Sequence, residues 1–134
     1  MATTYKYSDF DIDFNRNEFI DDMSIKKDFN SIRQSVMNIV LTKPGEKPFN
    51  REFGVGIHNM LFELWTPFQK SLLERNIKWE VDRLEPRAEV TAVNIDEDEI
   101  DSNEVSIEIK FNIVLGERSE PIKDSIRIAL TKVR

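Results

Sequence analysis

A segment rich in glycine and proline, KPGEKPFNREFGVG at residues 43–56, contains the residue types that build phosphate-binding loops. It holds three of the four glycines and two of the five prolines of the chain. A P-loop requires a lysine directly after its second glycine, but Val55 follows Gly54. A dinucleotide-binding fingerprint requires a further glycine at position 59, where the chain has Asn59. The segment therefore matches neither phosphate-binding pattern.

The same segment is better explained as a rigid corner between two helices, because glycine permits a positive φ and proline restricts φ to one value. We expect Phe49 and Phe53 to insert into the core and hold this corner in place. Lys43, Lys47 and Arg51 could instead hold an anion, although solvated loop charges are the simpler interpretation. The predicted corner residues are Pro44, Gly45, Pro48, Phe49, Phe53 and Gly54.

Metal chemistry has little support in the sequence. His58 is the only histidine and there is no cysteine, so the usual ligand set of a zinc site is missing. The aspartates of residues 9–13 match the first three ligands of a calcium loop, but Phe14 and Ile20 replace the required glycine and glutamate. The acidic run at residues 96–99 is interpreted as a solvated turn. We predict no metal site and no cofactor.

Paired carboxylates could in principle cleave a glycosidic bond. That mechanism needs two carboxyl groups roughly 5–10 Å apart, one of them with a raised pKa. The chain has 25 acidic residues, so a pair can always be nominated, but no pattern marks a cleft or a desolvated acid. We therefore predict that the protein is not an enzyme and has no catalytic residue, and keep a lysozyme-like hydrolase as the alternative.

Size and composition indicate one domain of 134 residues with a substantial core, since 40% of residues are hydrophobic and nine are phenylalanine. The formal charge of −6 argues against binding nucleic acid through its phosphates. No apolar run reaches the roughly 20 residues that span a bilayer, so no membrane partner is expected. We predict an extended N-terminal arm at residues 1–27 and a single domain at residues 28–134.

Three helices are predicted in the N-terminal half of the domain. Apolar residues recur at helical spacing over residues 28–42, and Pro44 prevents continuation. A short helix is expected over residues 57–64. A longer one follows at residues 66–84, with Thr66 as its N-cap, proline at the first position and Gln69 completing a capping box.

This longer helix has two apolar stripes on nearly opposite sides, which predicts that it is covered twice. We interpret it as lying between the protein's own sheet and its first helix, with contact to a partner protein as the alternative. One stripe contains Phe68, Leu72 and Trp79. The other contains Leu73, Ile77, Val81 and Leu84.

Three strands follow, at residues 89–95, 104–115 and 121–131, each with alternating apolar residues. Their short connections favour an antiparallel meander, and helices followed by strands indicate the α+β class. Helices of the N-terminal half should therefore pack on a C-terminal antiparallel sheet of about three strands. In the last strand, the residues expected to face the core are Ile122, Ile126, Ile128 and Leu130.

The tripeptide Glu85-Pro86-Arg87 closes the long helix. Pro86 ends it, and Arg87 lies near the negative end of the helix dipole. Considered alone, the motif is a helix stop with two solvated charges. We therefore expect that Glu85 and Arg87 can be replaced at little cost to folding.

The order of these motifs resembles the baseplate wedge and sheath-initiator family of contractile-tailed bacteriophages, which also supplies a baseplate subunit of type VI secretion systems. The resemblance covers about residues 30–131 and includes the helix SIRQSVMNIVLT, the corner, LFE, and the long helix that ends in Glu-Pro-Arg. Lys47 stands where arginine is common, and Asn50 and Arg51 where a proline often falls. The early YSDFD segment looks more like the tailed-phage branch than the secretion branch.

The resemblance implies a structural protein of the virion's tail baseplate, made and assembled in the host cytoplasm. Its expected partners are other wedge proteins, the tail sheath protein, and tail tube or hub proteins. By the family pattern, Glu85, Pro86 and Arg87 would contact the helical core bundle of the wedge. The alternatives are the lysozyme-like hydrolase and the equivalent type VI secretion subunit.

The resemblance also implies that an edge of the C-terminal sheet is extended by the first sheath subunits. A sheet edge presents unpaired N–H and C=O groups that can accept another strand. Our hypothesis places this contact on the strand at residues 121–131. Its rivals are that the acidic FDIDF segment covers this edge, or that the strand at 89–95 is used. The residues proposed to bind the partner are Ile126, Arg127, Ile128, Ala129 and Leu130.

Overall fold

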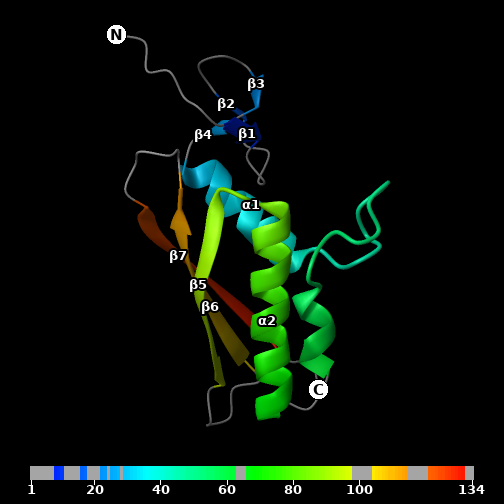
Figure 1. Ribbon diagram of the computed structural model, residues 1–134. Coiled ribbons are helices and arrows are strands. Elements are labelled where there is room, and N and C mark those ends of the chain that lie inside the picture. The colour runs from blue at the N-terminus through cyan, green and yellow to red at the C-terminus, as the bar shows by residue number, and fades with distance from the viewer. Residues whose placement is uncertain are drawn as a thin grey trace.

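The computed structural model describes residues 8–10, 16–17, 22–23, 25–27, 29–62, 66–97, 104–114 and 121–131 of the chain. Its helices lie on one side of a three-stranded antiparallel sheet (Figure 1), which confirms the predicted α+β class. The calcium-like residues Asp11 and Asp13, and the predicted element ends at Leu64 and Leu115, lie outside the described residues. The division into an arm and a domain stays a prediction.

Near the N-terminus the chain pairs with itself. Strand β1 (Ser8–Phe10) pairs with β4 (Ile25–Lys27), and β2 (Arg16–Asn17) pairs with β3 (Asp22–Met23), both antiparallel. These pairs lie beyond α1, at one end of the molecule (Figure 1). Phe10, the described residue of the FDIDF segment, is therefore paired within the arm and not with the C-terminal sheet.

The first two helices have the predicted positions. Helix α1 (Phe29–Leu41) buries Ile32, Val36 and Ile39 completely or nearly so. A short 3₁₀-helix, η1 (Ile57–Phe62), follows the corner. No helix in the described part of the chain is long and apolar enough to cross a bilayer.

Helix α2 (Pro67–Leu84) begins with the predicted capping box. The amide of Gln69 donates to the Thr66 hydroxyl at 3.3 Å, and the Thr66 amide donates to the Gln69 side chain at 3.2 Å. This reciprocal pair satisfies two of the amides that a helix start leaves open, and it fixes where the helix begins.

Only one stripe of α2 is covered. Leu73, Ile77 and Val81 are fully buried against the sheet and α1. On the opposite side, Phe68 is 75% exposed and Trp79 is 69% exposed. The interpretation of α2 as a helix covered on both sides by its own protein is therefore wrong for the described residues, because α1 packs on the same side of α2 as the core.

The sheet is a meander of β5 (Ala88–Glu97), β6 (Glu104–Ile113) and β7 (Ile122–Thr131), in that spatial order. β7 pairs with β6 over ten residues without a shift of register, whereas β5 has a bulge between Val90 and Ala92. One face of the sheet is apolar and packs under the helices. Its buried side chains from β6 and β7 are Val105, Ile107, Ile109, Phe111, Ile113, Ile126, Ile128 and Leu130.

Ile122 departs from the predicted inward set, because 44% of its surface is exposed. It occupies the first position of a strand that, among the described strands, has no neighbour on its outer side. A side chain there lacks the cover that a flanking strand would provide.

The corner caps the end of α1. The amide of Val55 donates to the carbonyl of Ile39 at 3.0 Å, and the amide of Gly56 donates to that of Thr42 at 2.9 Å. These bonds satisfy carbonyl groups that a helix terminus leaves open. Gly54 directly precedes these two residues, has φ +102° and is buried. The glycines thus let the chain fold back against the helix that it has just left.

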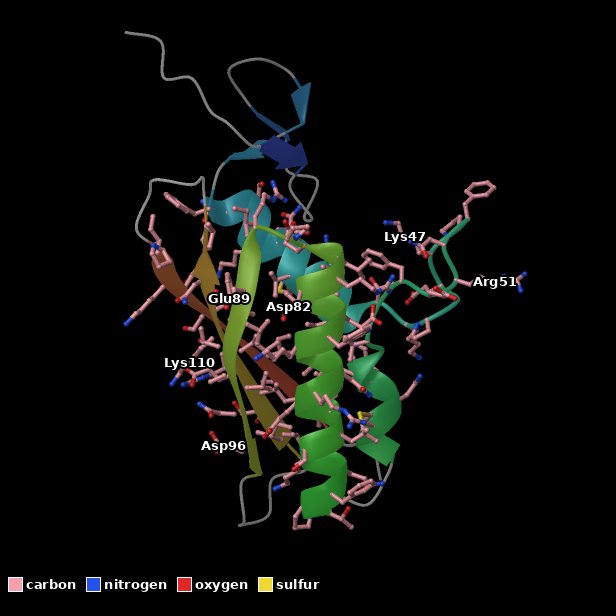
Figure 2. All side chains as sticks on the ribbon, viewed as in Figure 1. Lys47, Arg51, Asp82, Glu89, Asp96 and Lys110 are labelled. Carbon is pink, nitrogen blue, oxygen red and sulfur yellow. The ribbon has the colours of Figure 1, made fainter. Side chains whose placement is uncertain are left out.

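The two phenylalanines of the corner differ in burial. Phe53 is half-buried against the core, and the Lys47 ammonium lies 3.9 Å from the centre of its ring. Phe49 is fully exposed, with φ +63°, so the prediction that it inserts into the core is wrong. Its loop projects away from the helices, as the positions of Lys47 and Arg51 in Figure 2 show.

Gly54→Ala should destabilise the protein by roughly 3–5 kcal/mol, through backbone strain at positive φ together with overpacking. A β-carbon at Gly54 would lie 2.2 Å from the Thr42 carbonyl oxygen, an atom of the helix end that cannot move alone. Gly54→Val should be worse. Thermal or chemical denaturation measures the loss.

Gly45→Ala is the matched control. Gly45 also has positive φ, +89°, but a β-carbon there would meet nothing within 4 Å. Strain alone should then cost about 1–2 kcal/mol. Equal losses for the two variants would show that close approach to Thr42 is not what requires glycine at position 54.

Candidate functional site

The motif Glu85-Pro86-Arg87 forms the junction between α2 and β5. The amide of Glu85 still donates to the Val81 carbonyl at 2.8 Å, so the helical hydrogen bonding continues one residue beyond Leu84. Glu85 is only 3% exposed. The expectation of a solvated charge at this position is therefore wrong.

Glu85 and Arg87 form a buried ion pair with two hydrogen bonds. Arg87 Nε donates to Glu85 Oε1 at 2.5 Å, and Nη2 donates to Oε2 at 2.6 Å. The Glu85 side chain is 4% exposed and that of Arg87 is 30% exposed. This bidentate geometry is the strongest form of an arginine–carboxylate contact.

The environment of Glu85 keeps it charged. Burial on its own would raise the pKa of Glu85, but hydrogen bonds from Arg87 and Ser35 and the Arg87 charge outweigh it. The pKa therefore lies below the usual value of a glutamate. Because Ser35 belongs to α1, the carboxylate connects that helix to the end of α2.

Backbone bonds join the sheet to the same junction. The amide of Ala88 donates to the Glu85 carbonyl at 3.0 Å, and the amide of Val114, just after β6, donates to the Arg87 carbonyl at 2.9 Å. The junction thus connects α1, α2, β5 and β6. At this junction Pro86 is exposed, and the Arg87 side chain is 30% exposed.

The outer side of β7 is a free sheet edge, because β7 pairs only with β6 among the described strands. The orientation of its backbone can be read at Ser125, whose amide donates to its neighbour Asp124 at 2.8 Å and whose carbonyl accepts from Arg33 at 3.1 Å. Lys110, which pairs with Ser125, turns its carbonyl toward β5, where it accepts from Thr91 at 3.1 Å. Ser125 therefore turns its backbone groups away from β6.

Alternation along an antiparallel strand extends this orientation to every second residue. Lys123, Arg127, Ala129 and Thr131 direct their backbone N–H and C=O groups to the free edge. The backbone groups of Ser125 are not available to an added strand. Its N–H already donates to Asp124, and its C=O already accepts from Arg33. In the described part of the chain, the edge groups of the C-terminal half of β7 have no hydrogen-bond partner, although the short helix η1 also contacts β7.

The residues proposed for partner binding on β7 thus divide into two sets. Arg127 and Ala129 have exposed side chains and backbone groups at the edge. Ile126, Ile128 and Leu130 have side chains in the core and backbone groups that face β6. They stabilise the strand but cannot donate to an added one.

The other edge of the sheet is less available. The β5 ladder is interrupted by its bulge, and the amide of Val90 there donates to Asp82 of α2 at 3.3 Å. Figure 2 shows Asp82 of α2 close to the start of β5. Bulges and covering groups are common protections of sheet edges.

The outer face of the sheet is polar. Glu108 accepts from Asn94 at 3.3 Å and lies 3.4 Å from the Lys110 ammonium and 3.6 Å from the Arg127 guanidinium. The Asn94 hydrogen bond, with the nearby cations, lowers the pKa of Glu108. Lys110 points outward from this face in Figure 2.

General acid catalysis by a carboxyl group needs a raised pKa. The pKa of Glu85 and that of Glu108 are both lowered. Among the described residues, no group of three or more histidine, cysteine or acidic side chains is arranged to hold a metal ion.

Comparison with known proteins identifies the family. Residues 27–118 match the family described as baseplate wedge protein gp25. The chain belongs to this family. It is 35% identical over 115 residues to baseplate wedge protein gp25 of Enterobacteria phage T4, a match that covers 85% of this chain and 86% of the T4 protein. The resemblance seen in the sequence is thereby confirmed.

Solved structures with the same fold support the architecture of this gp25-family chain. A chain of the anti-feeding prophage baseplate, determined by cryo-electron microscopy, matches with a TM-score of 0.71 at 22% identity, over 78% of this chain and 83% of that one. A protein from Geobacter sulfurreducens, provisionally named a tail lysozyme, matches with a TM-score of 0.63 at 24% identity, over 77% and 89%. At these identities the likeness concerns the fold.

Sequence reasoning missed several residues of these sites. Ser35, Arg33 and Asp124 have no distinctive sequence context, and each acts through a contact that only the folded chain creates. The exposure of Phe68 and Trp79 agrees with the alternative interpretation of α2, in which one of its two apolar stripes contacts a partner protein. The helical spacing of these apolar residues was the feature of the sequence that indicated a second stripe.

Arg87→Ala should cost about 3 kcal/mol of folding free energy at neutral pH, because it leaves a buried carboxylate without its partner. In the native protein, the lowered pKa of Glu85 contributes stability that is lost as pH falls through its folded-state value. In the variant burial dominates and raises that pKa, so protonation favours the folded state. The deficit relative to the native protein should shrink as pH is lowered, as denaturation at several pH values will measure.

Glu85→Gln provides the comparison, since it keeps the shape and removes the charge. Its deficit at neutral pH should be smaller, about 1–2 kcal/mol, because Arg87 can still reach water. If Arg87→Ala melts like the native protein at neutral pH, the pair does not hold the junction together.

Proposed function

We propose that this protein is a structural, non-enzymatic component of the baseplate of a contractile tail, and that it starts the sheath. In this proposal the protein is made in the host cytoplasm and is incorporated in the virion, beside other wedge proteins and the tail tube or hub. Extended segments of the first sheath subunits add to the free edge of β7. Membership of the gp25 family supports the location, and the open edge supports the contact.

The single observation that supports the sheath contact is the regular pairing of β7 and the direction of its edge groups. It is a regular strand of ten paired residues, and the edge groups of Arg127, Ala129 and Thr131 are directed away from β6. β-Augmentation draws its affinity from such main-chain groups and its register from alternate side chains. β5 offers a bulged edge that α2 already contacts, so β7 is the better acceptor.

A second contact is proposed for the junction. Pro86 and the exposed part of Arg87 meet the helical core bundle of the wedge, while Glu85 orients the arginine from inside. A guanidinium held by a buried carboxylate has a fixed orientation, which favours specific recognition. Glu85 is thus a positioning residue in this contact.

The alternative of a lysozyme-like hydrolase draws on the provisional name of the Geobacter protein. Glu85 is committed to its ion pair and is 3% exposed, and Glu108 lies among cations on an open sheet face. Neither arrangement favours protonation of a leaving group. The equivalent role in a type VI secretion baseplate would use the same surfaces.

Ala129→Pro should leave the fold intact and prevent sheath addition. The amide of Ala129 faces the free edge, so proline removes a donor that an added strand needs and none that β6 uses. Hydrogen exchange with purified sheath protein should show new protection at Arg127, Ala129 and Thr131 in the native protein. The variant should show none of this protection, and tails carrying it should lack sheath.

Ile128→Pro is the matched control, one residue away, because its amide donates within the β6–β7 ladder. It should damage the fold itself. Protection that appears on β5 instead, or sheath assembly that is unaffected by Ala129→Pro, would rule out this edge.

A further inference from the structure

The C-terminal half of β7 is the open half of the sheet edge, and its geometry allows it to pair with a copy of itself. Arg127, Ala129 and Thr131 direct their backbone N–H and C=O groups outward, and these groups have no hydrogen-bond partner among the described residues. Two antiparallel strands exchange such groups only where edge-facing residues lie opposite each other. Two identical strands that pair symmetrically through the open half must therefore be centred on one of these three residues.

Only the register centred on Ala129 pairs all three open positions. Ala129 then lies opposite Ala129 of the second copy, and Arg127 lies opposite Thr131 in both directions. Centring on Arg127 would place two guanidinium groups opposite each other and would require Ser125, whose groups are already occupied. Centring on Thr131 would pair only Thr131 within the open half. The edge is thus self-complementary in a single register.

Charges on the outer face of the sheet favour the same register. Glu104 lies opposite Thr131 on β6, is exposed, and forms no ion pair within the described residues. Arg127 of the second copy would lie on the other side of Thr131, about 10 Å from Glu104, which is two strand spacings. These two long side chains can meet over the small threonine. The symmetry supplies the contact twice, so each copy meets an opposite charge.

The two-fold axis of such a pair is perpendicular to the sheet. Two three-stranded sheets then join into one continuous sheet, with the helices of both copies on the same face. The short helix η1, which contacts β7, borders the seam in each copy. Pairing of this kind removes the open edge, which would otherwise favour uncontrolled association with other strands.

We propose that in the free protein the open half of β7 binds β7 of a second copy, antiparallel and centred on Ala129. The dimer is closed, because both copies use the same groups. A sheath segment that adds to this edge needs the same groups, so the dimer must separate before the sheath can start. The dimer rests on the geometry of the edge and not on the proposed sheath contact, and the experiments on it use the purified protein alone.

Disulfide crosslinking tests the register, because the chain has no cysteine of its own. Ala129→Cys should give a covalent dimer under mild oxidation, since Cα atoms of a hydrogen-bonded antiparallel pair are about 5.5 Å apart, a distance that a disulfide spans. Arg127→Cys alone should crosslink poorly, and mixed with Thr131→Cys it should give a covalent heterodimer. Crosslinking of Arg127→Cys with itself as fast as that of Ala129→Cys, or no crosslinking of Ala129→Cys, would overturn the proposal.

Sedimentation provides an independent readout. The native protein should shift from monomer to dimer as its concentration rises to about 1 mM, where even a weak association is populated. Glu104→Arg should weaken dimerisation by about five-fold or more, because it then meets Arg127 of the second copy. The matched control, Glu104→Arg with Arg127→Glu, restores opposite charges and should restore dimerisation. Both variants should melt like the native protein, since these side chains are exposed.

Two results would contradict the dimer. A native protein that stays monomeric at every concentration, as it would if a segment of its own chain covered the edge, excludes it. Failure of the charge exchange to restore dimerisation excludes the register. Neither result depends on whether sheath protein adds to β7 in the assembled tail.

Discussion

The buried ion pair between Glu85 and Arg87 is the interaction on which the rest of the structure depends. Its carboxylate is reached by Ser35 of α1, its residues connect α2 to β5, and the Arg87 carbonyl receives the amide that follows β6. Removing such a carboxylate from water is unfavourable unless its hydrogen bonds are nearly complete. The pair and its backbone contacts thus join α1, α2, β5 and β6 at one point.

That arrangement decides which surfaces remain for assembly. The helices cover one face of the sheet, so the open surfaces of the described residues include the polar outer face, the β7 edge and the side of α2 that exposes Phe68 and Trp79. The junction holds α2 directly, and it holds β7 only through the ladder between β7 and β6. Rigid presentation lowers the entropy lost on binding, which suits a component of a larger assembly. The corner has a related role, because it ends α1 and directs the chain back toward the core.

Much of the fold could be predicted from local patterns. The α+β class, the capping box at Thr66 and the three-strand meander follow from period, capping residues and short connections. The burial of Glu85 could not be predicted, because it depends on Ser35 and on the end of β6, both distant in sequence. Phe49 was misplaced because an apolar residue type does not reveal whether its loop turns inward or projects.

The assembly surfaces were predictable only in part. Apolar alternation indicates which side chains of β7 face the core, but the direction of its backbone groups depends on pairing with Lys110 and on the contacts of Ser125. In the same way, two stripes on α2 indicate two covered sides without showing what covers the second. Family membership supplied the context for both surfaces, and the described geometry supplied the individual residues.

The central claim is that the open half of β7 receives a strand from the sheath. The most direct measurement is a cryo-electron-microscopy map of the baseplate with its first sheath ring, at a resolution that separates strands. The account predicts an added strand beside Arg127, Ala129 and Thr131 that ends before Ser125, where Arg33 occupies the carbonyl. A sheath segment paired with β5, or a β7 edge left bare in the assembled tail, would contradict it.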